Sequence, residues 1–214
     1  MKKTVMGKRI NDIIKELKRL YPDAGPALVF SNPYELLMAT MLSAQCTDRQ
    51  VNRVTPAVFL KYPNVQAMAD ADADELHVLV KSCGFRSKAD HMIGACRIIE
   101  KRYGGEVPRS LKELTELPGV GRKTANVVLA NAFNIPAFAV DTHVFRVCHR
   151  LGLSDGKTPE KTEEQMTAQL PKADWGKAHH MFIAHGRQVC RAQNPGCAGC
   201  TLRGFCEYVK QKSD

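Results

Sequence analysis

The sequence predicts an all-α protein. Apolar residues recur every three or four positions along most of the chain, which is the spacing of one face of an α-helix. Residues that favour helix starts precede many of these stretches, and glycines follow several of them. No stretch shows the apolar–polar alternation that is typical of a half-buried strand.

Each helix expected in the first third of the chain has a local reason. The first follows apolar residues at helical spacing: Ile10, Ile13, Ile14, Leu17 and Leu20. Asn32 can cap the next helix, with Pro33 at its first position, and this helix should run to about Ala44. Asp48 should cap a third helix, which Pro56 should kink or split.

Similar signals continue through the middle of the chain. One helix should open at Asp72 and close at Gly84, and the next should open at Ser87 and end at Gly104. A short helix should follow Ser110. The later expected helices run from Lys123 to about Phe133 and over about Thr142–Leu151, Pro159–Leu170 and Trp175–Cys190. Such a series could pack as one bundle, since no clear linker or repeat divides it.

The stretch Leu117–Val128 is a candidate phosphate site. Pro118, Gly119 and Gly121 predict a tight turn directly before an apolar helix. Glycines allow close approach of another molecule, and the N–H groups at a helix start attract anions. An ordinary helix–helix connection can carry the same glycines, so the prediction depends on the whole stretch.

Lys123 and Asp141 form a candidate catalytic pair. Lys123 lies in the first turn of the helix behind the glycines, where a lysine is more often a simple phosphate contact than a nucleophile. Asp141 follows 18 residues later, which suits a helix, a return loop and a second helix that faces the same space. A neutral lysine can attack carbon, and a carboxylate can accept its proton. A plain helix cap explains Asp141 equally well.

Cysteine spacing indicates a metal centre near the C-terminus. Four of the eight cysteines fall within 17 positions, with gaps of six, two and five residues: Cys190, Cys197, Cys200 and Cys206. Zinc and an iron–sulfur cluster both suit four thiolates, and chemistry alone leaves the choice open. The other four cysteines are expected to be small buried apolar residues: Cys46, Cys83, Cys96 and Cys148.

Composition points to an acidic partner. The formal net charge is +9 and the sequence pI is about 9.2, without a block of like charges. The basic start Met1–Thr4 leads into no apolar signal segment, and no run reaches membrane-spanning length. We therefore expect a soluble, cytoplasmic chain without a membrane partner.

Several motifs in the same order make the chain resemble the helix-hairpin-helix, Gly/Pro-rich base-excision DNA glycosylases, and their bifunctional glycosylase–lyase members above all. The similarity covers almost the whole chain. Its motifs are Leu42–Asp48, Gly105–Pro108, Leu117–Val128, Val140–Arg146, His185–Arg187 and the four C-terminal cysteines.

The resemblance implies two all-α lobes with a DNA-binding cleft between them. A six-helix barrel lobe would span residues 25–135, with the helix-hairpin-helix at about 111–133. An iron–sulfur lobe would combine residues 1–24 with 136–214. Lys123 and Asp141 would face each other at the mouth of the cleft, and the four C-terminal cysteines would hold a [4Fe-4S] cluster.

The resemblance also implies an activity. A monomer would bind damaged duplex DNA and remove oxidised or ring-saturated pyrimidines, such as thymine glycol. Lys123 would attack the sugar and form a Schiff base, Asp141 would assist, and β-elimination would cut the strand 3′ to the abasic site. Gln45 would fill the space left by the extruded base, and Phe85 would wedge the stack. The other implied DNA contacts are Leu117, Gly119, Val120, Gly121, Arg122, Thr124, His143 and Arg191.

The chain departs from the family pattern in two places. The segment after Gly84 is one residue shorter than usual and lacks its customary aromatic residue, which puts Phe85 as the wedge in doubt. Between Cys190 and Cys197, Arg191 is the only basic residue. We therefore expect a weaker salt dependence from this loop than is usual in the family.

Two other functions are compatible with parts of the sequence. A monofunctional adenine or mismatch glycosylase uses a glutamate before the glutamine and lacks the lysine, whereas Leu37–Ala44 contains no carboxylate and Lys123 is present. A non-catalytic DNA-binding protein would need only the hairpin, so the Lys123 and Asp141 pair and the Gln45 segment count against it.

Overall fold

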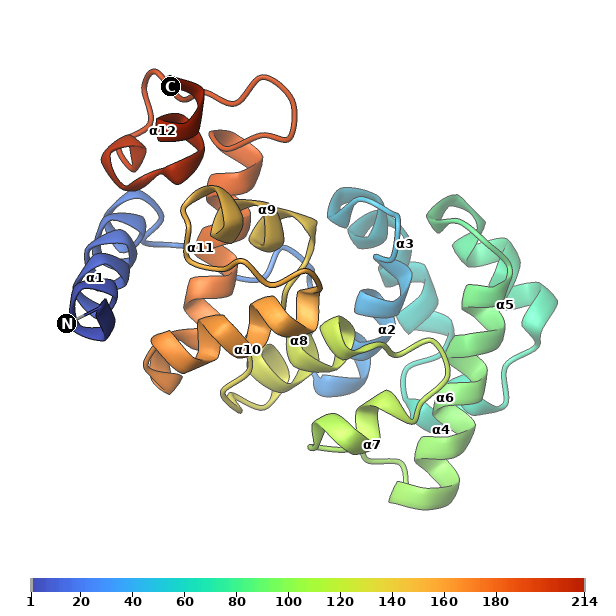
Figure 1. The fold of residues 1–214 in the computed structure, drawn as a ribbon. Helices are drawn as coiled ribbons and strands as arrows, with labels where there is room; N and C mark the ends of the chain where they lie inside the picture. The colour runs from blue at the N-terminus through green and yellow to red at the C-terminus, as the bar shows by residue number, and fades with distance from the viewer. Residues whose placement is uncertain (1, 214) are drawn as a thin grey trace. The chain divides into compact units, whose positions relative to one another are not determined.

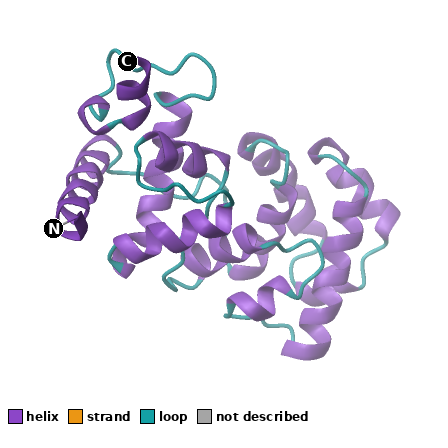
Figure 2. Cartoon of the chain, in the orientation of Figure 1, coloured by secondary structure: helices purple, strands orange, loops and turns teal. Residues whose placement is uncertain are grey.

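The computed structural model describes residues 2–213, and the side chains of residues 9–211. Helices joined by loops and turns account for this part of the chain, which contains no strand (Figures 1 and 2). The predicted all-α class is therefore confirmed. None of the described helices has the length and apolar character needed to span a membrane.

Contacts divide the chain into two compact units. The central unit is Pro26–Ile135, and the terminal unit combines Met1–Gly25 with Pro136–Asp214. The terminal unit is therefore discontinuous in sequence, and it brings the first helix together with the C-terminal half of the chain.

The central unit contains seven α-helices and one 3₁₀ turn among its described residues. They are α2 (Pro33–Leu42), α3 (Asp48–Lys61), α4 (Val65–Ala69), α5 (Ala73–Val80), η1 (Lys81–Cys83), α6 (Ser87–Tyr103), α7 (Leu111–Thr115) and α8 (Arg122–Ala132). Asn32 caps α2 by accepting a bond from Glu35 N at 2.9 Å, as the sequence predicts.

Helix α2 forms the middle of the central core. Its side chains are buried on nearly every face, with Leu36, Leu37 and Met38 almost fully enclosed. It packs against α8, while α6 packs against α4 and α5. A helix that is apolar all round needs neighbours on all sides, and the packed helices supply them. The turn that follows Leu42 is therefore held by a firmly packed helix.

The terminal unit contains five α-helices and two 3₁₀ turns among its described residues. They are α1 (Lys2–Leu20), α9 (Thr142–Arg150), α10 (Pro159–Gln169), η2 (Lys172–Asp174), α11 (Trp175–Gln188), η3 (Arg203–Phe205) and α12 (Glu207–Ser213). Figure 1 shows α1, in blue, in the same body as the orange and red helices of the C-terminal half.

Helix α11 organises the terminal core. Helices α1 and α9 both pack against it. Ile13 and Leu17 of α1 are fully buried in this core, and Phe138 meets Phe182 edge to face at a ring distance of 6.3 Å. Buried aromatic and aliphatic side chains of this kind supply most of the free energy that holds the unit together.

Several local predictions need correction. Thr47, not Asp48, caps α3, because its hydroxyl accepts from Gln50 N. Pro56 neither ends nor splits α3, since Val54 and Val58 are buried on either side of it and hold the helix in place. Helix α6 begins at Ser87 and ends at the C-cap Gly104, as the sequence predicts, although no side-chain cap bond forms at Arg86 before it.

Other differences concern extent and exposure. The helix that starts after Asp72 ends at Val80, and the 3₁₀ turn η1 fills the gap to Gly84. The five-residue α4, capped by Asn64, is too short for a periodic pattern to predict. Cys46 is half-buried, whereas the other cysteines expected to be buried are so: Cys83, Cys96 and Cys148.

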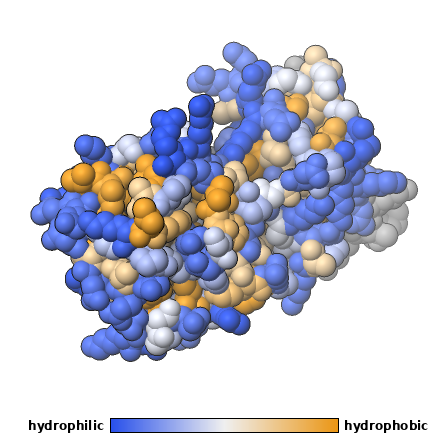
Figure 3. All heavy atoms as spheres, turned by 180° about the vertical axis from the view of Figure 1, so that it is seen from behind, coloured by the Kyte–Doolittle hydropathy of each residue, from blue (hydrophilic) through white to orange (hydrophobic). Residues whose placement is uncertain are grey.

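The surface is mixed in character. Figure 3 shows one face on which hydrophilic side chains dominate and smaller apolar patches lie between them. The large apolar side chains that are most exposed are Val29, Leu60, Val78 and Phe85. Single exposed apolar residues are normal on proteins, so only Phe85 calls for a functional explanation, because the sequence predicts a role for it.

Arg9 joins α1 to the C-terminal half of the terminal unit. Its Nη2 donates to the carbonyl oxygens of Leu151 and Phe205, both at 2.6 Å, and to Glu207 at 2.8 Å. We expect Arg9→Met to reduce the free energy of unfolding by about 2 kcal/mol, since part-buried acceptors lose a charged donor. Urea unfolding checks this, with Lys15→Met on an exposed position of α1 as control. Equal stability of the two variants would contradict the role given to Arg9.

Candidate functional site

The hairpin between α7 and α8 is anchored by two buried side chains. Leu117 N donates to Leu114 O at 3.2 Å, and Val120 N donates to Leu117 O at 3.1 Å. Leu117 is 2% exposed and Val120 is 5% exposed, so their side chains face the core of the central unit. Any ligand contact by these two residues would therefore involve the main chain.

Gly119 and Gly121 serve the turn in different ways. Gly119 has φ +73°, and a Cβ there would lie 2.8 Å from His91 Cβ. Only glycine fits this position without strain and without displacing His91. Gly121 is the N-cap of α8 with φ −85°, and a Cβ there would meet no atom within 4 Å.

The start of α8 is open to a ligand. Arg122 and Lys123 are exposed and Thr124 is half-buried. The bond from Ala125 N to Gly121 O, at 3.0 Å, connects the cap to the helix, so the N–H groups before Ala125 precede the helical ladder. Gly121 offers no side chain to cap them. The helix start therefore has the features of an anion site, with Lys123 in its first turn.

In the terminal unit, Asp141 is the N-cap of α9. Its Oδ1 accepts from His143 N and from Val144 N, both at 2.8 Å. Neither bond involves Oδ2. The predicted helix-cap role is therefore confirmed, and the cap fixes the direction of the carboxylate while using a single oxygen.

His143 lies in a tightly bonded part of α9. Arg146 Nη2 lies 3.1 Å from His143 Nδ1 and donates to Gly186 O at 2.9 Å, and Arg146 Nε donates to Cys190 O at 3.0 Å. A Cβ on Gly186 would lie 3.0 Å from His143 Cβ, so the glycine lets α11 approach α9 closely. Burial is the main cause that lowers the pKa of His143.

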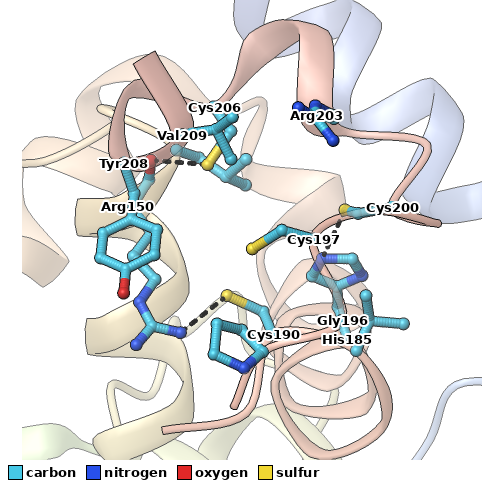
Figure 4. Close-up of a pocket in the computed structure, with 13 residues that line it drawn as sticks. Arg150, His185, Cys190, Gly196, Cys197, Cys200, Arg203, Cys206, Tyr208 and Val209 are labelled. Carbon is cyan, nitrogen blue, oxygen red and sulfur yellow. Dashed lines mark hydrogen bonds between the residues drawn. The ribbon is translucent and has the colours of Figure 1, made fainter. Parts of the chain in front are cut away.

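The four C-terminal cysteines line one pocket of the terminal unit. Cys190, Cys197, Cys200 and Cys206 contribute to its wall. In Figure 4 they lie around the pocket, and they come from the loop after α11 and the segment before α12. Among the described residues, no three cysteine, histidine or acidic side chains already form a metal-binding group.

Neighbouring side chains bond to these thiols. Arg150 Nη1 lies 3.5 Å from Cys190 Sγ, and His185 Nε2 lies 3.7 Å from Cys200 Sγ (Figure 4). Cys206 Sγ donates to Arg150 O at 3.2 Å. Burial raises the pKa of the Cys200 thiol, and the other three cysteines raise it further. Thiolates gathered in this way need a cationic centre to offset their repulsion, so the donor set fits a metal centre.

The predicted base-gap and wedge residues lie in two turns of the central unit. Gln45 is exposed, with φ +56°, in the turn between α2 and α3. Phe85 is 72% exposed and follows Gly84, whose φ is +120°. A non-glycine residue with positive φ, such as Gln45, is uncommon, and so is a largely exposed aromatic ring, such as that of Phe85. Each turn therefore holds one unusual residue that is exposed to solvent.

Arg191 lies in the loop after α11. Its Nη2 donates to Asn194 O at 3.1 Å, and its own carbonyl oxygen accepts from Arg150 at 2.7 Å. The side chain remains exposed. The structure thus places Arg191 on the surface of the terminal unit, in a loop that Arg150 holds.

Sequence reasoning missed Arg150 and Tyr208. Arg150 is the last residue of α9, and its guanidinium donates to the carbonyl oxygens of Arg191 and Ala192 in the loop after α11. The same guanidinium lies 4.5 Å from the ring centroid of Tyr208. A basic residue in the last turn of a helix is common for dipole reasons alone, so the sequence carries no signal for its place beside the cysteines. Lys123 belongs to the central unit and Asp141 to the terminal unit.

Comparisons with known proteins give a consistent result. The family described as the HhH-GPD superfamily base excision DNA repair protein matches residues 38–172. Endonuclease III of a Synechocystis species is 48% identical over 92% of this chain and 91% of its own length. Endonuclease III of Bacillus subtilis is 46% identical over 96% of this chain and 94% of its own length.

A solved structure is similar over nearly the whole chain. It is described as a trapped endonuclease III–DNA covalent intermediate in an estranged-adenine complex. It superposes with a TM-score of 0.92 at 42% identity, and covers 97% of this chain and 99% of its own.

The two hairpin glycines allow a matched test. We expect Gly119→Ala to reduce the free energy of unfolding by about 2 kcal/mol, because φ is positive and His91 occupies the space. Gly121→Ala should change it by less than about 1 kcal/mol, since its φ is ordinary and its surroundings are open. Chemical denaturation measures both, and a similar loss in the two variants would contradict this account of the turn.

Proposed function

The chain belongs to the HhH-GPD superfamily of base excision DNA repair proteins, and within it to the endonuclease III family, and on this basis we propose that it is a DNA glycosylase and abasic-site lyase. Its substrate is duplex DNA that contains an oxidised or ring-saturated pyrimidine, such as thymine glycol. The observation that carries the proposal is an exposed lysine, Lys123, in the first turn of α8 directly behind a glycine turn with the features of an anion site.

Lys123 is the proposed nucleophile. Its neutral amine attacks C1′ of the damaged nucleotide, and the base leaves with the electron pair of the glycosidic bond. The C1′–O4′ bond of the sugar ring then breaks, O4′ takes up a proton, and an iminium forms between C1′ and the lysine nitrogen. This iminium withdraws electrons and acidifies the proton at C2′. Removal of that proton expels the 3′ phosphate by β-elimination, which cuts the strand. The damaged base must leave the helical stack before the attack can occur.

Asp141 is the proposed carboxylate partner. A lysine attacks only after losing a proton, and a carboxylate can accept that proton or stabilise a cationic sugar. The two cap bonds to Oδ1 support the role because they hold the carboxylate in one orientation. The second oxygen, Oδ2, takes part in neither bond.

The proposed DNA contacts are of two kinds. Main-chain N–H groups of the hairpin and the exposed Arg122 and Arg191 side chains suit phosphates. Gln45 and Phe85 suit the base stack, because each extends from a turn into solvent. The similar endonuclease III proteins are bacterial, and bacterial DNA lies in the cytoplasm, so we place the protein there.

The four C-terminal cysteines are the proposed ligands of a [4Fe-4S] cluster. The resemblance to the family implies such a cluster, and the four thiols line one pocket, which supports the proposal. A cluster bound there would cross-link the loop after α11 to the segment before α12 through cysteine thiolates. Its proposed role is structural, since no step above needs an electron.

Covalent trapping tests the lysine chemistry. We expect borohydride to trap the chain on a thymine glycol duplex and on an abasic duplex. Lys123→Gln should reduce trapping and strand cleavage by about a thousandfold or more while DNA binding remains. Gel analysis of adduct and product measures both. Trapping on the abasic duplex alone would identify a lyase with another base substrate. Cleavage by Lys123→Gln at the normal rate would exclude Lys123 as the nucleophile.

Iron content tests the cluster. We expect the purified chain to be yellow-brown and to contain about four irons, with Cys206→Ser losing colour and iron. Cys46→Ser is the control, because Cys46 lies outside the pocket. A colourless chain that contains zinc would contradict the proposed cluster but leave the thiol ligands in place.

A further inference from the structure

One ammonium group joins two turns of the central unit. Lys88, in the first turn of α6, extends to main-chain carbonyl oxygens from two separate segments. Its Nζ donates to Leu42 O at 2.8 Å and to Ala44 O at 2.6 Å, and it also donates to Cys83 O. The acceptors are 46, 44 and 5 residues away in sequence.

These bonds match the donors that lysine has. An ammonium carries three N–H donors and no acceptor, and Lys88 makes three bonds to carbonyl oxygens. Leu42 is the last residue of α2, and Cys83 is the last residue of η1. Carbonyl oxygens at helix ends lack partners within the helix and attract cations. Lys88 therefore satisfies two helix ends and one turn at the same time.

The two segments are those that carry Gln45 and Phe85. Gln45 directly follows Ala44, and Phe85 lies two residues after Cys83. Because the oxygens of Ala44 and Cys83 bond to the same nitrogen, they lie within two hydrogen-bond lengths of each other. A second bond joins the start of α3 to η1, since Gln50 Nε2 donates to Ser82 Oγ at 2.8 Å.

The ammonium lies in a partly enclosed place between the two turns. Gly84 has φ +120°, and a Cβ there would lie 3.4 Å from Lys88 Nζ. The Lys88 side chain is half-buried, and burial is the largest cause that lowers its pKa. The thiols of Cys46 and Cys83 face the same group. Lys88 thus lies beneath the two turns and not on their outer surface.

We propose that Lys88 is a positioning residue that holds Gln45 and Phe85 in a single arrangement, ready to enter the base stack. This inference rests on the proposed function. Without the ammonium, the turn after α2 and the segment after η1 would each lose their shared anchor. Entry into the stack would then require both turns to be ordered during DNA binding, and the rate of base extrusion would fall.

Lys88 could instead act as a simple positive charge that attracts phosphate. The two roles differ in their salt dependence. Loss of one phosphate contact lowers the slope of log affinity against log salt by about 0.9, whereas loss of a positioning residue leaves this slope unchanged. Lys81→Met is the matched control, because Lys81 is an exposed lysine of the same segment.

The decisive experiment is a double-mutant cycle. Single-turnover cleavage of a thymine glycol duplex is measured for Lys88→Met, Gln45→Ala and the double variant. We expect Lys88→Met to slow cleavage by about ten- to a hundredfold, since small misplacements have effects of that size. In the Gln45→Ala background, Lys88→Met should have a smaller effect, because one of the two residues it positions is already absent. Equal effects in both backgrounds would overturn the proposal.

Two further measurements complete the test. Borohydride trapping on a single-stranded abasic oligonucleotide should be the same for Lys88→Met and the unaltered chain, since no stack is entered there. The salt slope on duplex DNA should also be unchanged. A slope lowered by about 0.9 would overturn the proposal in favour of a phosphate contact.

Hydrogen exchange tests, independently of activity, whether Lys88 holds the two turns. Cys46 N donates to Ser43 O at 3.1 Å, and Gly84 N donates to Lys81 O at 3.2 Å. Both amides should exchange about tenfold faster in Lys88→Met than in Lys81→Met if the ammonium holds the turns. Unchanged exchange would overturn the proposal. Absence of trapping by the unaltered chain on every substrate would instead overturn the proposed function, and exchange would still report on Lys88.

Discussion

The turns of this protein depend on cationic side chains that donate to main-chain carbonyl oxygens. An all-helical fold has no sheet to pair the carbonyl groups at its helix ends, and such groups need other partners. Long lysine and arginine side chains supply them here. Lys88 holds the turns after α2 and η1, and Arg146 holds the end of α11 against α9. Arg150 does the same for the loop after α11.

This use of cations changes the meaning of the net charge. The chain has a formal charge of +9, which suits an anionic partner. Several of the contributing side chains are nevertheless bonded to carbonyl oxygens, as Arg9, Lys88 and Arg150 are. The cations that suit phosphate are therefore a smaller set than composition indicates.

Sequence reasoning predicted local features well and long-range bonds poorly. The caps at Asn32, Ser110 and Asp141 followed from residue type, because a short polar side chain bonds to its own helix start. Cysteine spacing likewise identified the four residues that line one pocket. The carbonyl partners of Lys88 and Arg150 left no trace in the sequence, since a flexible side chain can bond to residues more than 40 positions away. The choice between two adjacent capping residues was also ambiguous, since Thr47 caps α3 where the sequence predicted Asp48.

The discontinuous terminal unit has a consequence for biosynthesis. Helix α1 leaves the ribosome before the central unit. The residues that pack against its buried side chains Ile13 and Leu17 belong to the C-terminal half. The whole central unit, Pro26–Ile135, is synthesised in between. At a synthesis rate of about 5–20 residues per second, the apolar side of α1 stays without its packing partners for roughly 5 to 20 seconds. The nascent chain thus exposes the apolar surface of α1 during translation. Of the two units, the central one is complete first and can fold first.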